Sequence, residues 1–212
     1  MKRVLIHGLG QTAQSWNETA AAMERCGGRS DVMCPDLTEL LGNKKPCWDE
    51  LYGAFEEYCL GFGEPVELCG LSLGGILAIR FCEEHSDMVS GAVLIGAQFV
   101  MPKNLLRFQN AVFHLMPKSA FDNTGFGKKE LLSLARSMET LDFSEDLERI
   151  TCPTLIICGE KDKPNRKAAI RMNAGIKGSE LLIVAGSGHE VNVDRPDELG
   201  KAISVFFGKK CS

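Results

Sequence analysis

Six short apolar runs spread along the 212 residues constrain the fold of this chain more than any other feature. Each run is rich in Val, Ile, Leu or Cys and is too short for a typical helix, as expected for strands buried on both faces. Helical patterns separate most of the runs, and this alternation favours an α/β fold with helices on both faces of a parallel sheet. The runs are Arg3 to His7, Asp31 to Cys34, Pro65 to Gly70, Gly91 to Gly96, Thr154 to Gly159 and Glu180 to Ala185.

The order of the strands can be predicted from the handedness of their connections. Right-handed crossovers force a reversal of chain direction across the sheet, which places Arg3 to His7 inside it, between Asp31 to Cys34 and Pro65 to Gly70. We therefore expect six parallel strands. No linker divides the sequence, so residues 1–212 are expected to form a single domain.

Composition excludes several classes of partner. The net charge is −4 without a long Lys/Arg run, so a nucleic-acid partner is not expected. No stretch approaches the roughly 20 apolar residues that cross a bilayer, and Gly8 and Gly10 end the first apolar run too early for a signal peptide. Nine cysteines without a CxxC spacing indicate reduced, mostly buried thiols. These features predict a cytoplasmic protein without a membrane partner, and they leave its oligomeric state open.

The segment Gly70-Leu71-Ser72-Leu73-Gly74 is the strongest local motif. It lies between an apolar run and a helical pattern, which is the context expected for a G-x-S-x-G turn that exposes a nucleophilic serine. Such a turn needs small flanking residues, because the backbone bends sharply and neighbouring segments approach closely. A bare pentapeptide of this kind also arises by chance, and the alternative is a glycine-rich turn with an incidental serine.

Two further residues follow strand-like runs and supply the chemistry that such a serine needs. Asp162 comes after Thr154 to Gly159, and His189 comes after the last run. An imidazole can accept the proton of Ser72, and a carboxylate can orient the ring and stabilise its charged form. Taken alone, each is more often an ordinary loop residue, but the order Ser, Asp, His favours a catalytic triad. Glu160 and Asp194 are the competing candidates for the acid.

The segment His7-Gly8-Leu9-Gly10 follows the first run, and with the serine turn and the order of the triad it makes the chain resemble the α/β-hydrolase superfamily. The resemblance covers nearly the whole chain and implies a three-layer α/β-hydrolase fold. It also implies an oxyanion hole formed by the N–H groups of Leu9 and Leu73. In this motif His7 is expected to be structural, without a role in proton transfer.

Two departures from the superfamily pattern stand out. Relatives usually carry an antiparallel strand pair before the oxyanion strand, whereas this sequence starts at that strand, which predicts a shorter sheet. Many relatives also have Gly-x-Gly after the aspartate equivalent to Asp36, where this chain has Thr38-Glu39-Leu40. The second departure leaves open what lines that side of the site.

The resemblance implies a serine hydrolase that cleaves a small carboxylic ester or thioester through an acyl-enzyme intermediate, with a small acyl compound as its substrate. The alternatives are a C–C hydrolase, lactonase or lyase that uses the same triad, and a non-catalytic binding or sensor protein on the same scaffold. The sequence shows no metal-ligand cluster, and Gly8-Leu9-Gly10 lacks the continuation of a dinucleotide site, so no metal or cofactor is expected.

The segment from Pro102 to about Leu141 departs from the alternation of strand and helix. It contains helical patterns without a convincing strand, which predicts a small helical cap over one end of the sheet. Its large apolar side chains exceed what an exposed hairpin can bury, so Phe108, Phe113 and Met116 are expected to contact a modest apolar acyl group.

Basic residues outnumber acidic ones in this segment. The excess favours an anionic end on the substrate, although a solvated basic face is the commoner reason for such an excess. The basic residues are Lys103, Arg107, Lys118, Lys128, Lys129 and Arg136, and the acidic ones are Asp122, Glu130 and Glu139.

Overall fold

The computed structural model describes residues 1–27, 31–101 and 125–208 of the chain. Six strands form one sheet in the order β2-β1-β3-β4-β5-β6, and all neighbouring pairs are parallel, which confirms the predicted α/β fold. The strands are β1 (Lys2–Ile6), β2 (Asp31–Met33), β3 (Val66–Leu71), β4 (Val89–Ile95), β5 (Thr154–Gly159) and β6 (Glu180–Val184).

The first strand lies inside the sheet, as the crossover argument predicts. Lys2 of β1 is in register with Asp31 of β2, and Ile6 of β1 is in register with Gly70 of β3. The second strand, β2, therefore lies on one side of β1, and β3 to β6 follow in order on its other side. The carboxyl ends of β1 and β3 meet at this reversal, which is where α/β sheets usually bind ligands.

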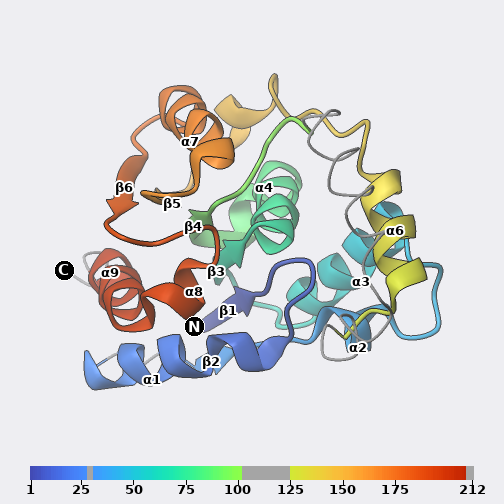
Figure 1. The fold of residues 1–212 in the computed structure, drawn as a ribbon, viewed down its shortest axis with the longest axis horizontal. Helices are drawn as coiled ribbons and strands as arrows, with labels where there is room; N and C mark the ends of the chain where they lie inside the picture. The colour runs from blue at the N-terminus through green and yellow to red at the C-terminus, as the bar shows by residue number, and fades with distance from the viewer. Residues whose placement is uncertain (28–30, 102–124, 209–212) are drawn as a thin grey trace.

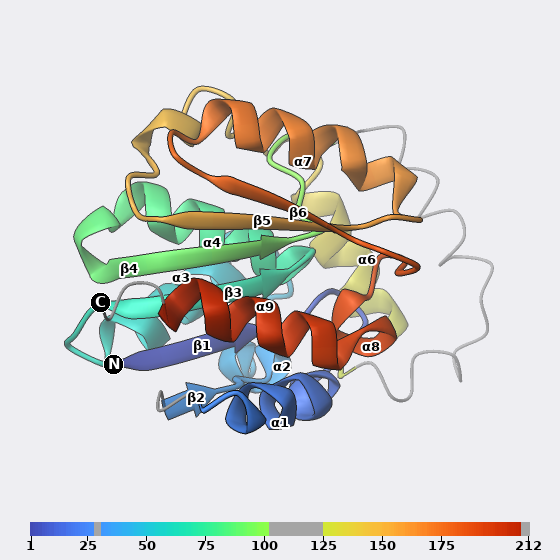
Figure 2. The ribbon, with the colours of Figure 1, turned by 90° about the vertical axis from the view of Figure 1, so that its left-hand side faces the viewer.

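Helices cover both faces of the sheet, because successive strand residues point to opposite sides. Val4 and Ile6 belong to one buried apolar cluster and Leu5 belongs to the other. The helices α1 (Asn17–Arg25) and α9 (Pro196–Gly208) cover the Leu5 face, while α3 (Trp48–Leu60), α4 (Leu73–Glu84) and α7 (Lys163–Gly175) cover the other face. Figure 1 looks along the strands with α9 and α1 on one side and α3 and α4 on the other, and Figure 2 shows the strands side-on.

A short helix, α2 (Leu37–Leu41), begins directly after the second strand. The Asp36 carboxylate accepts a hydrogen bond from the N–H of Thr38 at 2.9 Å and so caps the first turn. Thr38-Glu39-Leu40, where many relatives have Gly-x-Gly, therefore form helix.

The base of the expected cap is closed by an antiparallel bridge between Val100 and Asp142. The N–H of Met101 donates to the carbonyl of Leu141 at 3.0 Å, and the N–H of Phe143 donates to the carbonyl of Phe99 at 2.7 Å. The two ends of the segment thus leave and rejoin the body side by side.

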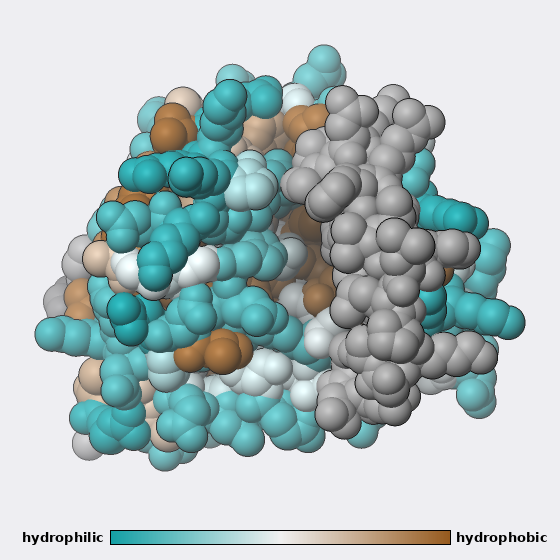
Figure 3. Space-filling model, viewed as in Figure 1, coloured by the Kyte–Doolittle hydropathy of each residue, from teal (hydrophilic) through white to brown (hydrophobic). Residues whose placement is uncertain are grey.

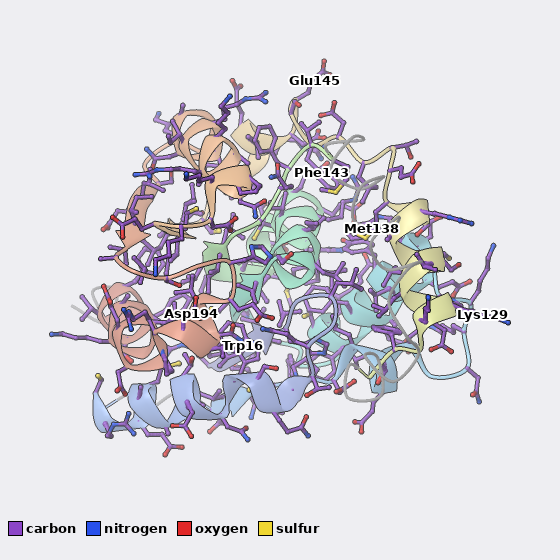
Figure 4. All side chains as sticks on the ribbon, in the orientation of Figure 1. Trp16, Lys129, Met138, Phe143, Glu145 and Asp194 are labelled. Atoms are coloured by element: carbon purple, nitrogen blue, oxygen red, sulfur yellow. The ribbon has the colours of Figure 1, made fainter. Side chains whose placement is uncertain are left out.

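The carboxyl-terminal part of that segment forms α6 (Lys128–Ser137). Its apolar face buries Leu131 and Leu134, and Met138 and Phe143 are buried in the same cluster (Figure 4). Phe108, Phe113 and Met116 lie outside the described residues, as do the charged residues between 102 and 124. The cap, the single domain and the substrate contacts of these three residues stay predictions.

The other described elements are short. They are η1 (Ala13–Trp16), η2 (Ser86–Met88), η4 (Leu147–Arg149) and α8 (Val191–Asp194). None of the helices in the described ranges has the length and apolar character needed to cross a bilayer. All eight cysteines in these ranges are free thiols, and burial raises the pKa of Cys34 and of Cys158 to about 11. These two side chains therefore remain uncharged at neutral pH.

Candidate active site

Ser72 lies on the turn between β3 and α4, in a backbone conformation that only glycine adopts readily. Its φ is 52° and its ψ is −110°, and it is the one non-glycine residue with positive φ in the described ranges. The N–H of Ser72 donates to the carbonyl of Ile95 at 2.8 Å, which ties the turn to the end of β4. Such strain persists only where the surrounding structure imposes it, and it is concentrated at functional sites.

The glycines beside Ser72 are required by the close approach of other backbone segments. A Cβ atom on Gly70 would lie 2.2 Å from the carbonyl oxygen of Gly74, and one on Gly74 would lie 2.2 Å from that of Ile6. Both distances are far below contact distance. The expected reason for small residues in this motif is confirmed.

Asp162 and His189 form a hydrogen-bonded pair at the carboxyl ends of β5 and β6. The Asp162 Oδ2 atom lies 2.7 Å from His189 Nδ1. Burial alone would raise the pKa of Asp162, but the hydrogen bond and charge of His189 and the amide of Asn165 outweigh it and hold that pKa below its usual range. The ionised carboxylate places the ring proton on Nδ1, which leaves Nε2 as the nitrogen that can accept a proton.

The two competing acids contact backbone, not the ring. Glu160 accepts a hydrogen bond from the N–H of Gly186 at 2.8 Å, and Asp194 accepts one from the N–H of Gly188 at 2.6 Å. Within the described ranges, Asp162 is the carboxylate that is bonded to His189. Glu160 and Asp194 instead hold the loop that carries the histidine.

Gly96, at the end of β4, makes room for the Asp162–His189 pair. Its φ is 53°, and a Cβ atom there would lie 3.0 Å from His189 Nδ1 and 3.3 Å from Asp162 Oδ2. The preceding residue, Ile95, accepts the hydrogen bond from Ser72. The end of β4 therefore contacts the serine turn through one residue and the imidazole through the next. Sequence reasoning missed Gly96 because a glycine that ends an apolar run has no distinctive pattern.

The loop after β1 packs against the serine turn. A Cβ atom on Gly8 would lie 3.5 Å from the Ser72 Cβ and 3.5 Å from the carbonyl oxygen of Leu71. In the described part of the chain, neither the N–H of Leu9 nor that of Leu73 donates to another protein group. Gly8 precedes Leu9 and Ser72 precedes Leu73, so the two N–H groups expected to bind an oxyanion belong to segments that contact each other.

His7 holds the start of this loop in place through hydrogen bonds of its imidazole ring. Its Nε2 accepts a hydrogen bond from the N–H of Leu37 at 3.0 Å, and its Nδ1 lies 2.9 Å from the carbonyl oxygen of Gly8. Burial lowers the pKa of His7, so the ring is neutral, with Nδ1 as donor. With both nitrogens bound to backbone groups, His7 has the structural role expected of it.

A buried pair of amides joins the oxyanion loop to the histidine loop, and sequence reasoning missed it. Gln11 Nε2 donates to Asn192 Oδ1 at 3.3 Å, and Asn192 Nδ2 donates to Gln11 Oε1 at 3.2 Å. Gln11 also receives a hydrogen bond from the N–H of Gly8 at 3.4 Å and donates to Glu190 at 3.0 Å. The pair spans 181 residues of sequence, so no local pattern could have indicated it.

Among the residues that the structure describes, one side-chain cluster has the composition of a metal site. Ligand atoms of Glu56, Glu84 and His85 lie within 4.8 Å of one another. The Glu84 carboxylate, however, forms an ion pair with Arg80, which balances its charge, and it also accepts a hydrogen bond from Tyr52. His85 follows the carboxyl-terminal end of α4, a helix of 12 residues that begins beside Ser72, so the cluster lies far from the serine turn.

Comparison with known proteins agrees with this arrangement. A model of the Alpha/beta hydrolase family matches residues 4–202. The chain belongs to this family. Among curated relatives of this α/β hydrolase, "Putative 2-succinyl-6-hydroxy-2,4-cyclohexadiene-1-carboxylate synthase" of Bacillus subtilis (strain 168) is 24% identical, over 96% of this chain and 89% of that protein. "Putative non-heme chloroperoxidase" of Synechocystis is 39% identical over 68 residues, which cover 31% of this chain but only 25% of that protein.

Solved structures share the fold of this α/β hydrolase. The enol-lactonase from Burkholderia xenovorans LB400 has a TM-score of 0.83 and is 17% identical, over 98% of this chain and 91% of that one. The structure of MenH from S. aureus has a TM-score of 0.81 and is 16% identical, over 100% of this chain and 95% of that one. These similarities establish the fold and leave the substrate to be inferred from the site.

Proposed function

We propose that this chain is a serine hydrolase that cleaves small carboxylic esters through an acyl-enzyme intermediate. The observation that carries the proposal is the strained turn at Ser72, located at the same edge of the sheet as the hydrogen-bonded pair of Asp162 and His189. A serine hydroxyl is a weak nucleophile until a base takes its proton, and His189 Nε2 is the base that this edge offers.

In the first step the Ser72 oxygen attacks the ester carbonyl carbon as its proton passes to His189 Nε2. The carbonyl oxygen becomes an oxyanion, which the N–H groups of Leu9 and Leu73 stabilise. The bond from carbon to the alcohol oxygen then breaks, and the alcohol leaves with the proton from His189. Asp162 stabilises the imidazolium between these two events and remains ionised throughout.

In the second step a water molecule repeats the sequence on the acyl-enzyme. His189 takes one proton of the water as its oxygen attacks the acyl carbon. The bond from that carbon to the Ser72 oxygen breaks, and the proton returns to the serine. The carboxylic acid leaves, so one ester and one water give one alcohol and one acid.

The surface supports an apolar acyl group. Figure 3 shows the face that looks onto the carboxyl ends of the strands, with hydrophobic residues on the floor of a recess near its centre. A thioester has the same acyl carbon and a better leaving group, so it belongs to the same substrate class. An apolar recess binds the acyl chain, and the two N–H donors fix the carbonyl.

The similarity to a synthase favours a second candidate function. Its name is that of a putative synthase and not of an esterase, and the match extends over 96% of this chain. In that case His189 would take its proton from Ser72 or from the substrate, and no ester would be needed. This candidate differs from the first in one measurable respect, which is turnover of simple esters.

A labelling experiment combined with an ester assay tests the proposal. We expect a fluorophosphonate probe to add once to the wild type and to Ser86→Ala, an exposed serine outside the site, but not to Ser72→Ala. Hydrolysis of a short p-nitrophenyl ester should disappear in Ser72→Ala and persist in Ser86→Ala. Labelling that survives in Ser72→Ala overturns the assignment of the nucleophile. Labelling of the wild type at Ser72 without ester turnover favours the second candidate, and no labelling at all favours a non-catalytic scaffold.

A further inference from the structure

The acid of the site is contacted on two sides, and only one of these contacts is the histidine. Asn165, three residues after Asp162 in the first turn of α7, points its Nδ2 atom at both carboxylate oxygens, at 2.8 Å from Oδ1 and 2.9 Å from Oδ2. Both side chains are buried, with 8% of Asn165 and 5% of Asp162 exposed. Hydrogen bonds from an amide to a buried, ionised carboxylate are among the stronger ones in proteins.

The orientation of the Asn165 amide is set by a third side chain. Gln98, two residues beyond Gly96, donates from its Nε2 to Asn165 Oδ1 at 2.6 Å. With Oδ1 occupied by this donor, Nδ2 has to face Asp162, since the opposite orientation would bring two amide donors together and set an oxygen against a carboxylate. The loop after β4 therefore makes room for the imidazole at Gly96 and fixes the neighbour of the acid through Gln98.

We propose that Asn165, held by Gln98, is a positioning residue of this site that directs the Asp162 carboxylate toward His189 and offsets part of its charge. The inference rests on the proposed function for its catalytic meaning, but the arrangement of the three side chains does not depend on the substrate. Asn165 Nδ2 also lies 3.1 Å from His189 Nδ1. Because Nδ1 carries the ring proton, two N–H groups share the Asp162 Oδ2 atom.

This arrangement changes how readily the His189 imidazole takes up a proton, and the direction of the change can be predicted. The amide N–H groups neutralise part of the carboxylate charge, and their positive ends lie beside the ring. Both effects make a charged imidazolium less favourable than it would be next to Asp162 alone. Removing the amide should therefore make His189 easier to protonate. A residue that merely packed against the site would not produce this change.

An NMR titration of the His189 imidazole tests the inference without relying on turnover. The signal is assigned by its loss in His189→Ala, and the midpoint of its titration is compared between the wild type and Asn165→Ala. We expect the midpoint to rise in Asn165→Ala and to stay at the wild-type position in the control variant. Asn173→Ala is the matched control, because Asn173 lies on the same helix and its carbonyl groups bind Ser179, away from the site.

The kinetic readout should follow the titration. The acid limb of kcat/KM is expected to move to higher pH by the same amount in Asn165→Ala, with kcat reduced about tenfold and KM within threefold of wild type. Gln98→Met keeps the length of the side chain but removes the donor, so it should give a smaller change in the same direction. It also carries the test if circular dichroism shows that Asn165→Ala does not fold.

The possible outcomes separate this inference from the proposed function. A titration midpoint that stays within 0.1 pH unit of wild type in both variants overturns the positioning role, whatever the activity. If the midpoint shifts in the variants while the wild-type protein neither binds the fluorophosphonate nor hydrolyses esters, the positioning role is supported and the ester hydrolase is rejected.

Discussion

The two sides of the site are held together by different kinds of hydrogen bond. On the acid side, the bonds of Asp162 to His189 and Asn165 measure 2.7 to 2.9 Å and involve a buried charge. On the oxyanion side, Gln11 and Asn192 exchange two bonds of 3.2 and 3.3 Å between neutral amides. Charge-assisted bonds are shorter and about twice as strong, and breaking one leaves a charge without a partner. The acid side should therefore be far less tolerant of substitution than the oxyanion side.

The largest effect is expected when the charge on the acid side is removed. Asp162→Asn keeps the shape of the side chain but cannot stabilise the imidazolium, and it favours the wrong tautomer of His189. We expect kcat/KM for a p-nitrophenyl ester to fall by roughly 10³- to 10⁴-fold. The limb in which activity rises with pH, as His189 loses its proton, should be absent in His189→Ala.

Asp87→Asn, an exposed carboxylate in η2, serves as the control for this variant and should retain wild-type activity. If Asp162→Asn stays within about threefold of wild type, Asp162 is the wrong acid. Glu160 and Asp194 would then be tested in the same way.

A moderate effect is expected on the oxyanion side. Gln11→Met and Asn192→Leu each break the amide pair and loosen the Gly8 N–H, which precedes the Leu9 donor. We expect kcat to fall about tenfold in each, because a displaced donor costs less than the 10²- to 10³-fold typical of a deleted one. The double variant should lose little more than either single variant, since the two side chains act through one contact. Additive losses would show that each amide acts independently.

The smallest effect is on stability and concerns its dependence on pH. The pKa of Asp162 is lower in the folded protein than its ordinary value, so its contribution to the free energy of unfolding is fully present above the unfolded pKa, near 3.9. It is lost as the pH falls through the lower, folded pKa. In urea denaturation, the difference between wild type and Asp162→Asn should shrink below about pH 4.

Asn192→Leu provides the contrasting case, because the Asn192 side chain bonds to the Gln11 amide and to the carbonyl of Ser15, and none of these groups titrates. Its cost in free energy of unfolding should be the same at pH 3.5 and at pH 7. An equal pH dependence in both variants would contradict the distinction between a charged and a neutral side of the site.

The elements predicted best are those marked by short-range patterns. Apolar runs gave the six strands and the interior position of β1, and Gly70 and Gly74 marked the serine turn because backbone approaches them too closely for a side chain. Asp162 and His189 were found because each directly follows a strand. Gln98 and the pair of Gln11 and Asn192 were missed because their contacts are distant in sequence, across 67 and 181 residues.

One region departs from the superfamily pattern in a way that the sequence left open. Thr38-Glu39-Leu40 form part of α2 because Asp36 can cap a helix there, a role that depends on its position relative to Ala13 and Thr38. Because Thr38-Glu39-Leu40 lacks the two glycines that many relatives have there, the sequence argued against a glycine-rich turn. It did not indicate which structure takes the place of that turn. The helix became evident only from the hydrogen bonds of Asp36.

The bridge between Val100 and Asp142 holds the two ends of the intervening segment together. Its two attachment points are paired with each other, and α6 packs its apolar face into the same core as the sheet, so a change of length is best tolerated where it leaves α6 in place. The entropic cost of a longer loop grows only slowly with length, so inserts of different size can be carried on the same base. A change of length before α6 should therefore leave Val100 and Asp142 paired.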